Sequence, residues 1–293
     1  MSEQRSGVLY GLAAYILWGV LPVYWKQLQS VSAFEILANR FIWSAVFVFI
    51  LLVGTGKVQV FREEVKAIFS NVASAVRMMC AAVLISFNWG IFIWAVEQGR
   101  IVETSMGYYI NPLVSVLFGV MFLRERLDKL QLIAVFFAFC GIGIILWSQG
   151  ELPWISVSLA TTFALYGLLK KIIKASALTS IMLETLFISP LALAYIYYLN
   201  SMEISAYQSG EPLTIALLVG AGAATATPLL LFTMSARLLP LNLVGFMQYL
   251  SPTISLFLGI FLYGEDFTAS HLAAFAAIWI GLGFFIWSQL RVR

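Results

Sequence analysis

Ten long apolar stretches dominate this amino-acid sequence. Each is about 20 residues long, the length that a helix needs to cross the hydrocarbon core of a bilayer. The stretches are continuously apolar rather than alternating, which favours helices over strands. The expected spans are residues 7–25, 33–53, 77–96, 102–123, 130–148, 152–169, 179–199, 213–236, 240–263 and 268–288. The sequence therefore predicts an all-α polytopic membrane protein with ten transmembrane helices.

The composition excludes a soluble protein. Of the 293 residues, 61% are hydrophobic and only 11% are charged, whereas soluble domains contain about 25% charged residues. Soluble enzymes, nucleic-acid binders and secreted disulfide modules are therefore ruled out. The two cysteines, Cys80 and Cys140, both lie in apolar stretches and indicate no disulfide framework.

Positive charge predicts the orientation of the spans. With the N-terminus in the cytoplasm, 14 of the 17 Lys and Arg residues fall in cytoplasmic segments, while Lys26 and Arg100 face out and Arg40 lies within a span. This bias follows the positive-inside rule, and ten spans return the C-terminus to the cytoplasm. The longest cytoplasmic connection, 54–76, has an apolar and a charged face, which predicts a short interfacial helix lying on the membrane, with a regulatory role left open as an alternative.

The second half of the sequence repeats the first at an offset of 140 residues, without a gap over about 40 positions. Shared apolar composition does not match Pro, Glu and a Trp-Ser-Gln triplet at one fixed offset, so the pattern indicates an internal duplication. The matched positions include Tyr109 and Tyr249, Pro112 and Pro252, Glu125 and Glu265, Gly141 and Gly281, Gly143 and Gly283, and the triplets Trp147–Gln149 and Trp287–Gln289.

The duplication predicts two five-helix repeats, residues 7–148 and 152–288. Because five is odd, the second repeat enters the membrane from the opposite side. Inverted repeats are typical of secondary transporters, which hold a solute near the midplane and expose it alternately to each side. A passive channel and a non-transporting membrane accessory subunit stay open as alternatives.

Polar stripes in two related spans indicate where a central site would lie. Each stripe has the i, i+3, i+7 spacing of one helical face, and each lies beside a proline, Pro112 or Pro252, which is expected to shape its helix. Interhelical hydrogen bonding is the alternative interpretation. The stripes are Tyr108, Asn111 and Ser115, and Gln248, Ser251 and Ser255.

Aromatic residues in mid-span add walls to this site. Asn88 and Trp89 lie deep in their span, away from the interface that tryptophan usually occupies. With the aromatics of other spans, including Tyr166, they predict a pocket for a partly apolar or aromatic solute, although simple packing explains any single ring equally well. The predicted substrate-binding residues are Trp18, Asn88, Trp89, Tyr108, Asn111, Gln248 and Tyr249.

Three charged residues fall within the spans, namely Glu35, Arg40 and Glu184. A carboxylate in a membrane can carry a proton, so Glu35, or Glu184 in the corresponding part of the second half, could couple transport to protons. Snorkelling of these side chains to water would leave them ordinary. Arg40 could pair with a substrate carboxylate or with Glu35.

Several chemistries have no support in the sequence. The segment Gly54–Lys57 lacks the spacing of a phosphate-binding loop. The single histidine, His271, is too isolated for a metal site or a nucleophile relay. No cluster of Asp, Glu or His suggests catalysis. The sequence thus predicts no enzyme activity, no metal and no cofactor.

Four motifs are distributed along the chain: Glu35–Arg40, Asn88-Trp89 with Ile93–Val96, Glu103–Leu113, and Gln248–Thr253 with Glu265. They resemble the RarD branch of the EamA family, within the drug/metabolite transporter superfamily, and the likeness covers nearly the whole chain. The resemblance implies two EamA repeats, a bacterial inner-membrane location and permease activity toward an amino acid, metabolite or drug, with a coupling proton or exchange solute left open. Asp266 departs from the family, which often has proline there.

Overall fold

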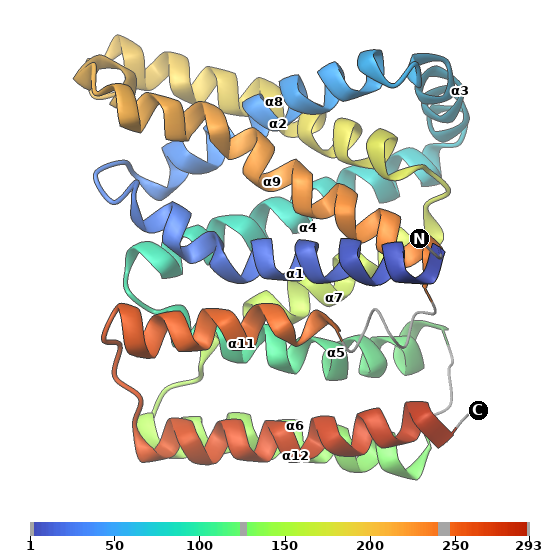
Figure 1. Ribbon diagram of the computed structural model, residues 1–293, viewed down its shortest axis with the longest axis vertical. Coiled ribbons are helices and arrows are strands. Elements are labelled where there is room, and N and C mark those ends of the chain that lie inside the picture. The colour runs from blue at the N-terminus through green and yellow to red at the C-terminus, as the bar shows by residue number, and fades with distance from the viewer. Residues whose placement is uncertain (1–2, 124–127, 240–246, 292–293) are drawn as a thin grey trace.

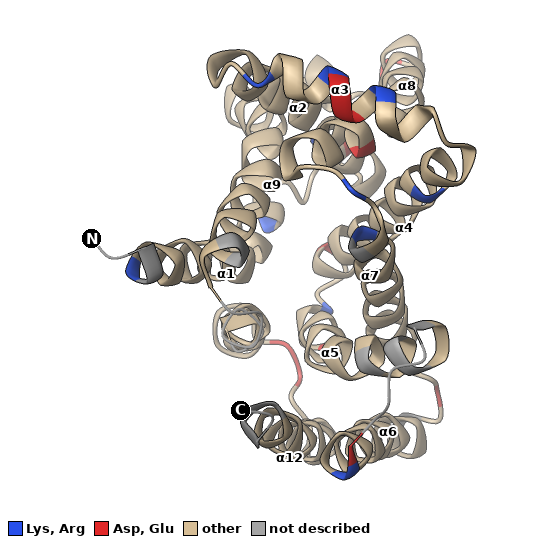
Figure 2. Ribbon diagram, turned by 90° about the vertical axis from the view of Figure 1, so that its right-hand side faces the viewer, with Lys and Arg blue, Asp and Glu red and all other residues tan. Residues whose placement is uncertain are grey.

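The computed structural model describes residues 3–123, 128–239 and 247–291, and these residues contain helices and no strand. In chain order they are α1 (Glu3–Lys26), α2 (Ala33–Gly54), α3 (Val58–Phe69), α4 (Val72–Glu97), α5 (Ile101–Leu123), α6 (Lys129–Gln149), α7 (Trp154–Ile172), α8 (Ala177–Ser201), η1 (Ala206–Ser209), α9 (Pro212–Leu238), α11 (Leu250–Phe257), the π-helix η2 (Leu258–Leu262) and α12 (Ala269–Arg291). Most of the long helices lie roughly parallel or antiparallel to one another, whereas α3 lies across one end of the bundle (Figure 1 and Figure 2).

The expected all-α membrane fold is confirmed. Among the described residues, seven helices are long and apolar enough to cross a membrane, namely α1, α2, α4, α6, α8, α9 and α12. Two more apolar helices are shorter, Trp154–Lys170 within α7 and Leu250–Leu262, which joins α11 and η2. Each expected span coincides with one of these helices or with α5, although residues 240–246 of the ninth lie outside the described part. The chain is a multi-pass membrane protein.

Serine caps set the starts of α2 and α8. Ser32 precedes α2 and Ser176 precedes α8, and each side-chain oxygen accepts a hydrogen bond from the backbone N–H three residues on. Such a cap satisfies one of the free donors at a helix N-terminus. The two serines therefore define equivalent origins from which α2 and α8 can be compared.

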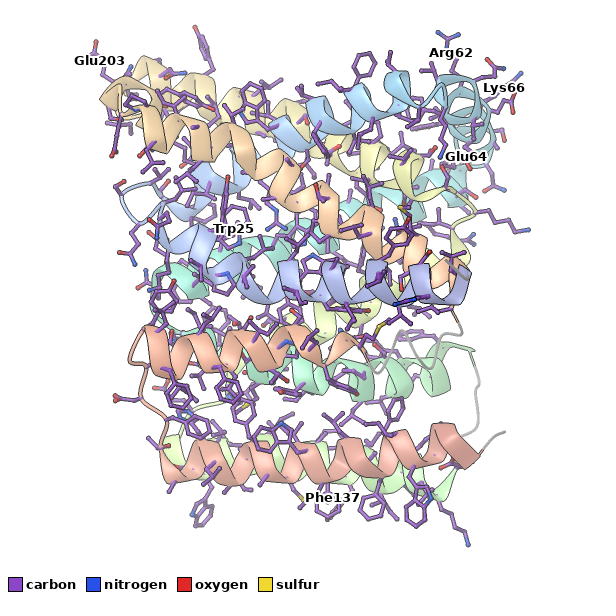
Figure 3. The ribbon with its side chains drawn as sticks, viewed as in Figure 1. Trp25, Arg62, Glu64, Lys66, Phe137 and Glu203 are labelled. Carbon is purple, nitrogen blue, oxygen red and sulfur yellow. The ribbon has the colours of Figure 1, made fainter. Side chains whose placement is uncertain are left out.

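The 54–76 connection contains the helix expected there, α3. Its Ile68 is buried and packs with Met78 of α4 and Leu183 of α8. Its charged residues, among them Arg62 and Lys66, project from one end of the bundle (Figure 3). Figure 2 looks onto this α3 end and shows further basic residues on α1, α4 and α7.

The helices pack in pairs that the duplication relates. The helix α6 packs against α12, α2 against α8 and α5 against α11, which would be the fifth, second and fourth helices of the two expected repeats. The contact of α1 with α9 corresponds to that of α7 with α4, and α1 with α11 corresponds to α7 with α5. Figure 1 shows α6 and α12 at one end of the long axis, and α2 and α8 at the other.

Matched glycines allow α6 and α12 to approach closely. A Cβ added to Gly141 would lie 3.0 Å from the carbonyl oxygen of Ala274. A Cβ added to Gly281 would lie 2.8 Å from the carbonyl oxygen of Ala134. These two contacts are related by the 140-residue offset of the duplication. The same residue types therefore perform the same packing role in both halves.

The caps of α6 and α12 are related in the same way. Asp128 and Gln131 form a reciprocal capping box at the start of α6. Thr268 and His271 lie 140 residues further on, and each backbone N–H bonds the other side chain at 3.3 Å. His271 is thus a helix-capping residue.

Candidate functional site

Arg40 is the centre of the most unusual cluster in the bundle. It lies on α2, is only 3% exposed, and its guanidinium carbon is 3.9 Å from the ring centroid of Trp89 and 5.2 Å from that of Trp25. Among the described residues, its buried Nε and Nη1 atoms have no hydrogen-bond partner. Trp25 lies toward the end of the bundle opposite α3 (Figure 3). Cation–π contacts stabilise the charge but do not satisfy these N–H donors.

Asn88 joins three helices beside this cluster. Its Nδ2 donates to the carbonyl oxygen of Leu159 at 3.0 Å and to Oγ1 of Thr162 at 2.9 Å, both on α7. Its Oδ1 accepts from the hydroxyl of Tyr108 on α5 at 3.2 Å. Tyr108 in turn lies close enough to Arg40 to interact electrostatically. The amide of Asn88 is therefore bonded at both ends to protein groups.

Asn111 lies one turn further along the same face of α5. It is 2% exposed, and its Oδ1 accepts from Ser115 at 3.0 Å. Its buried Nδ2 has no hydrogen-bond partner within the described ranges. Unlike Asn88, Asn111 keeps a donor that a bound molecule could use.

The second polar stripe is more fully engaged by protein. Ser255 donates to the carbonyl oxygen of Gly19 on α1 at 3.1 Å, which is the interhelical role considered from sequence. Gln248 is half-buried just before the turn at Tyr249. The ring of Tyr249 stacks on that of Tyr109, its counterpart in the first half, at 6.1 Å between centroids. The hydroxyl of Tyr249 is buried without a described partner.

The structure does not gather all the predicted aromatics into one pocket. Trp18 packs with Tyr15 at 5.5 Å and with Phe232 at 5.7 Å. Trp89 instead packs against Phe41 and Arg40. The predicted site residues are therefore divided between a cluster around Arg40 and separate contacts near the start of α11.

The two prolines occupy different places in their helices. Pro112 lies inside α5. Pro252 lies in the first turn of α11, immediately after the break at Tyr249. Proline cannot donate to the carbonyl one turn back, and a break before Pro252 is compatible with that restriction.

Glu35 is not the partner of Arg40. Its Oε1 accepts hydrogen bonds from Oγ of Ser205 and from the backbone N–H of Ala206, both at 2.9 Å. The described ion pairs do not include Glu35 with Arg40. Glu35 is 3% exposed, so it does not snorkel to water. It instead ties α2 to the connection before α9.

Glu184 is also buried, at 3% exposure, and has a complete set of partners. Its Oε1 accepts from Lys170 at 2.6 Å and from Ser180 at 2.9 Å, and its Oε2 accepts from Tyr166 at 3.0 Å. Counted from the equivalent caps Ser32 and Ser176, the eighth residue is Arg40 in α2 and Glu184 in α8. Glu184 therefore corresponds to Arg40 rather than to Glu35.

Sequence reasoning missed Trp25, Lys170 and Ser205. Trp25 lies at the end of its span, where tryptophan is ordinarily interfacial. Lys170 lies beyond the expected end of its span, but α7 continues to Ile172 and Lys170 reaches Glu184. A charged residue within one turn of a span end, opposite an intramembrane carboxylate, was the signal available for Lys170.

Glu265 connects the two halves at the end of the bundle opposite α3. Its carboxylate accepts hydrogen bonds from the backbone N–H groups of Ile101 and Val102, both at 2.8 Å, and so caps α5. Burial raises the pKa of Glu265 above its ordinary value, while these backbone donors oppose the rise. Its counterpart Glu125 lies outside the described residues.

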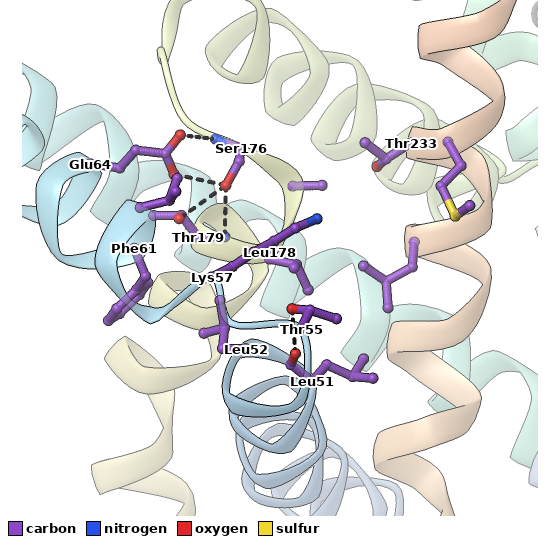
Figure 4. A pocket seen from close by; sticks show the side chains of 14 residues that line it. Leu51, Leu52, Thr55, Lys57, Phe61, Glu64, Ser176, Leu178, Thr179 and Thr233 are labelled. Atoms are coloured by element: carbon purple, nitrogen blue, oxygen red, sulfur yellow. Dashed lines mark hydrogen bonds between the residues drawn. The ribbon is translucent and has the colours of Figure 1, made fainter.

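A cavity of about 580 Å³ opens at the α3 end between α2, α3, α8 and α9 (Figure 4). Its polar edge contains Glu64, whose carboxylate accepts from the backbone N–H of Ser176 at 2.9 Å and from its hydroxyl at 2.7 Å. Leu178, Leu230 and other apolar residues form most of the wall. This cavity includes none of the residues predicted to bind substrate.

The helical bundle, with its buried polar and aromatic centre, defines a polytopic membrane protein. Comparison with known proteins then gives the family. Residues 5–147 match the EamA-like transporter family. The chain is 42% identical to "Uncharacterized transporter YojE" of Bacillus subtilis (strain 168), covering 99% of this chain and 96% of the relative. It is 39% identical to "Protein RarD" of Escherichia coli (strain K12), covering 99% and 97%.

A third relative is "Chloramphenicol-sensitive protein RarD" of Pseudomonas aeruginosa, which is 33% identical and is covered over 97% of its length by 100% of this chain. A solved crystal structure superimposes with a TM-score of 0.62 at 16% identity, covering 96% of this chain and 97% of the other, and supports the fold. The chain belongs to the RarD-type branch of the EamA family and is a membrane transporter.

Proposed function

We propose that this protein is a bacterial inner-membrane secondary transporter that moves a small organic solute by alternating access. The observation that carries the proposal is the exchange symmetry of the main helix contacts: α1 with α9 and α7 with α4, α1 with α11 and α7 with α5, and α2 with α9 and α8 with α4. Two inverted repeats, residues 7–148 and 152–288, would produce this symmetry. Rocking of one repeat against the other would then expose a central site to each side in turn.

All ten apolar helices would cross the membrane in this arrangement, with both termini in the cytoplasm. The basic residues at the α3 end support this orientation (Figure 2), because cytoplasmic segments are enriched in Lys and Arg. The helix α3 would then lie on the cytoplasmic surface. The stacked pair of Tyr109 and Tyr249, which are equivalent residues, supports a pseudo-two-fold axis near the centre of the bundle.

The solute would bind between the halves, near the polar faces of α5 and α11. We assign the walls to Trp18, Trp89, Tyr108 and Tyr249, and we assign hydrogen bonding first to Asn111, because its Nδ2 is buried and unpaired among the described residues. Asn88 and Gln248 would complete the polar lining. Pro112 and Pro252 would shape the two helices around the solute.

Coupling to a proton would require a buried carboxylate that can change its charge. Glu35 and Glu184 are the two buried carboxylates considered for this role, each 3% exposed. An exchanged solute is the alternative driving partner. No cofactor enters this mechanism.

Exchange in liposomes tests the proposed function. The purified protein is reconstituted into vesicles loaded with candidate solutes, including amino acids, nucleosides, organic acids and amphenicols, and uptake of the labelled solute is followed. A carrier gives saturable uptake that is accelerated by the same solute on the opposite side. Linear flux without exchange would instead indicate a passive channel. Absence of flux together with stable co-purification of one partner would indicate an accessory subunit.

A further inference from the structure

We propose that Arg40 binds the carboxylate of the transported solute, so that this transporter carries small organic anions with an apolar or aromatic body. The inference rests on the proposed transport function and assigns its substrate class. It is carried by the contacts of one buried cation whose surroundings provide aromatic faces but leave two N–H donors unpaired.

The charge of Arg40 lacks the compensation that the other buried charges have. A charged side chain within a membrane protein is costly unless an opposite charge or hydrogen bonds compensate it. The other buried charges have such compensation: Glu184 is paired with Lys170, and Glu35 is bonded to Ser205 and Ala206. Within the described part of the chain, no ion pair includes Arg40. Arg40 therefore lacks the acceptor that its burial calls for.

The geometry of the Arg40 guanidinium group leaves its in-plane N–H donors available. Contacts with Trp25 and Trp89 engage the face of a guanidinium, as cation–π contacts do. The five N–H donors lie in the plane of the group, so these contacts leave donors available. A carboxylate pairs in a bidentate way with two adjacent nitrogens of the fork, Nε with Nη2 or Nη1 with Nη2. Each of the two unpaired atoms, Nε and Nη1, therefore offers one half of such a pair. An aromatic wall beside a guanidinium fork suits an acid with an apolar body.

The partners of Arg40 come from three neighbouring helices. Among the described residues, Arg40 contacts Trp25 of α1 and Trp89 of α4 and interacts electrostatically with Tyr108 of α5, and none of these three is a carboxylate. Asn111 lies one turn beyond Tyr108 on the same helical face and has a free donor. One guanidinium with neutral donors is matched to a single negative charge, which favours a carboxylate over a phosphate dianion.

Pairs of acids and amides test this assignment. The full chain is purified in detergent, and its melting temperature is measured with phenylacetate, indole-3-acetate and short aliphatic acids, each beside its primary amide. We expect acids to raise the melting temperature by several degrees and the matching amides to have little effect. The shift should vanish in Arg40→Gln and shrink in Arg40→Lys, which retains the charge but not the fork. Arg62→Gln, on the exposed helix α3, is the control and should respond as the unaltered protein does.

The proposal is overturned if the amides match the acids, if Arg40→Gln retains the acid-specific shift, or if no acid raises the melting temperature. Equal shifts with chloride or sulfate would also overturn it, because they would indicate a site for inorganic anions. Where Arg40→Gln does not fold, Arg40→Met, which keeps the side-chain volume, replaces it in the same comparison.

Exchange in liposomes separates this proposal from the transport function. Acid-specific binding that depends on Arg40, without exchange of the acid, would keep the anion site and reject the carrier. Saturable exchange of a neutral solute that Arg40→Lys and Arg40→Gln leave unchanged would keep the carrier and reject the anion site.

Discussion

Arg40 and Glu184 occupy equivalent positions in the two halves, eight residues after the capping serines of α2 and α8, yet their surroundings differ completely. Glu184 accepts three hydrogen bonds, one of them from Lys170. Arg40 is as deeply buried but has two N–H groups without a described acceptor. The two positions share their distance from a capping serine but differ in their chemistry.

Buried charges in this fold are therefore of two kinds. A charge with a full set of protein partners holds helices together, as Glu184 does for α7 and α8. A buried charge with unused donors raises the free energy of the folded protein when no ligand is bound. Binding of a complementary group supplies the missing hydrogen bonds and lowers that free energy. The first kind of position is expected to support stability, and the second to support binding.

The largest expected effect comes from removing the satisfied charge. Glu184→Leu leaves Lys170 without its carboxylate and also frees the hydroxyls of Tyr166 and Ser180. We expect a loss of about 3–5 kcal/mol of stability, as for other broken buried pairs. The double variant Lys170→Met/Glu184→Leu should recover most of this loss. Denaturant unfolding in detergent measures both, and equal losses in the single and double variants would contradict the assignment.

Two asparagines repeat the contrast on a smaller scale. Asn88→Ala removes hydrogen bonds to α5 and α7 and should destabilise the protein by about 1–3 kcal/mol. Asn111→Ala removes the unpaired Nδ2 donor and the acceptor of Ser115, whose side chain is exposed, and should reduce solute exchange with a smaller loss of stability than Asn88→Ala. Melting temperature and exchange rate are measured for both variants. Normal exchange by Asn111→Ala would remove Asn111 from the site.

The glycines of α6 and α12 test whether matched positions in these two helices respond alike to substitution. Gly141→Ala and Gly281→Ala both place a Cβ against a carbonyl oxygen of the facing helix, and each should cost about 1–3 kcal/mol. The matched controls are Gly143→Ala and Gly283→Ala, where a Cβ meets no atom within 4 Å. Those two should be neutral or slightly stabilising, because alanine favours helix. Unequal effects within either pair, measured by thermal unfolding, would contradict equivalent packing.

The smallest effect is expected at the cap that Glu265 provides for α5. Glu265→Gln keeps the shape but loses the charge, and should cost about 1 kcal/mol or less. Because the pKa of Glu265 is raised in the folded protein, the folded state holds a proton that the unfolded chain has already released. The free energy of unfolding should therefore fall as pH rises from the ordinary pKa of a glutamate through the raised pKa of Glu265. In Glu265→Gln, this part of the pH dependence of the unfolding free energy should be absent. An unchanged pH profile would contradict the raised pKa of Glu265.

The positions of the long helices could be predicted from the sequence because they follow the apolar stretches, and seven of these helices are long and apolar enough to cross a membrane. The helix α3 followed from its segregated apolar and charged residues, and the matched Gly141 and Gly281 were visible at a fixed offset. The correspondence of Glu184 with Arg40 was not visible, because α2 and α8 are related by an offset of 144 rather than 140 residues. Only the caps Ser32 and Ser176 reveal that change of register.

The contacts of the site could not be predicted, because they depend on how separate helices meet. Asn88 and Asn111 look alike in sequence, and only the approach of α7 shows that Asn88 is already bonded. The pairing of Arg40 with Trp25 joins α2 to α1, and the diversion of Glu35 to Ser205 depends on the connection before α9. Residue type suggested polarity, but tertiary contacts determine which donors stay free.

The most direct measurement is the melting temperature of the ligand-free protein after Arg40→Met, determined beside Glu184→Leu in the same detergent. If Arg40 is a binding residue with unused donors, its replacement by an apolar side chain of similar volume removes an uncompensated charge, and the melting temperature should stay the same or rise. Glu184→Leu should lower it by several degrees. A fall in Arg40→Met as large as that in Glu184→Leu would show that Arg40 is a structural residue, and would contradict the account.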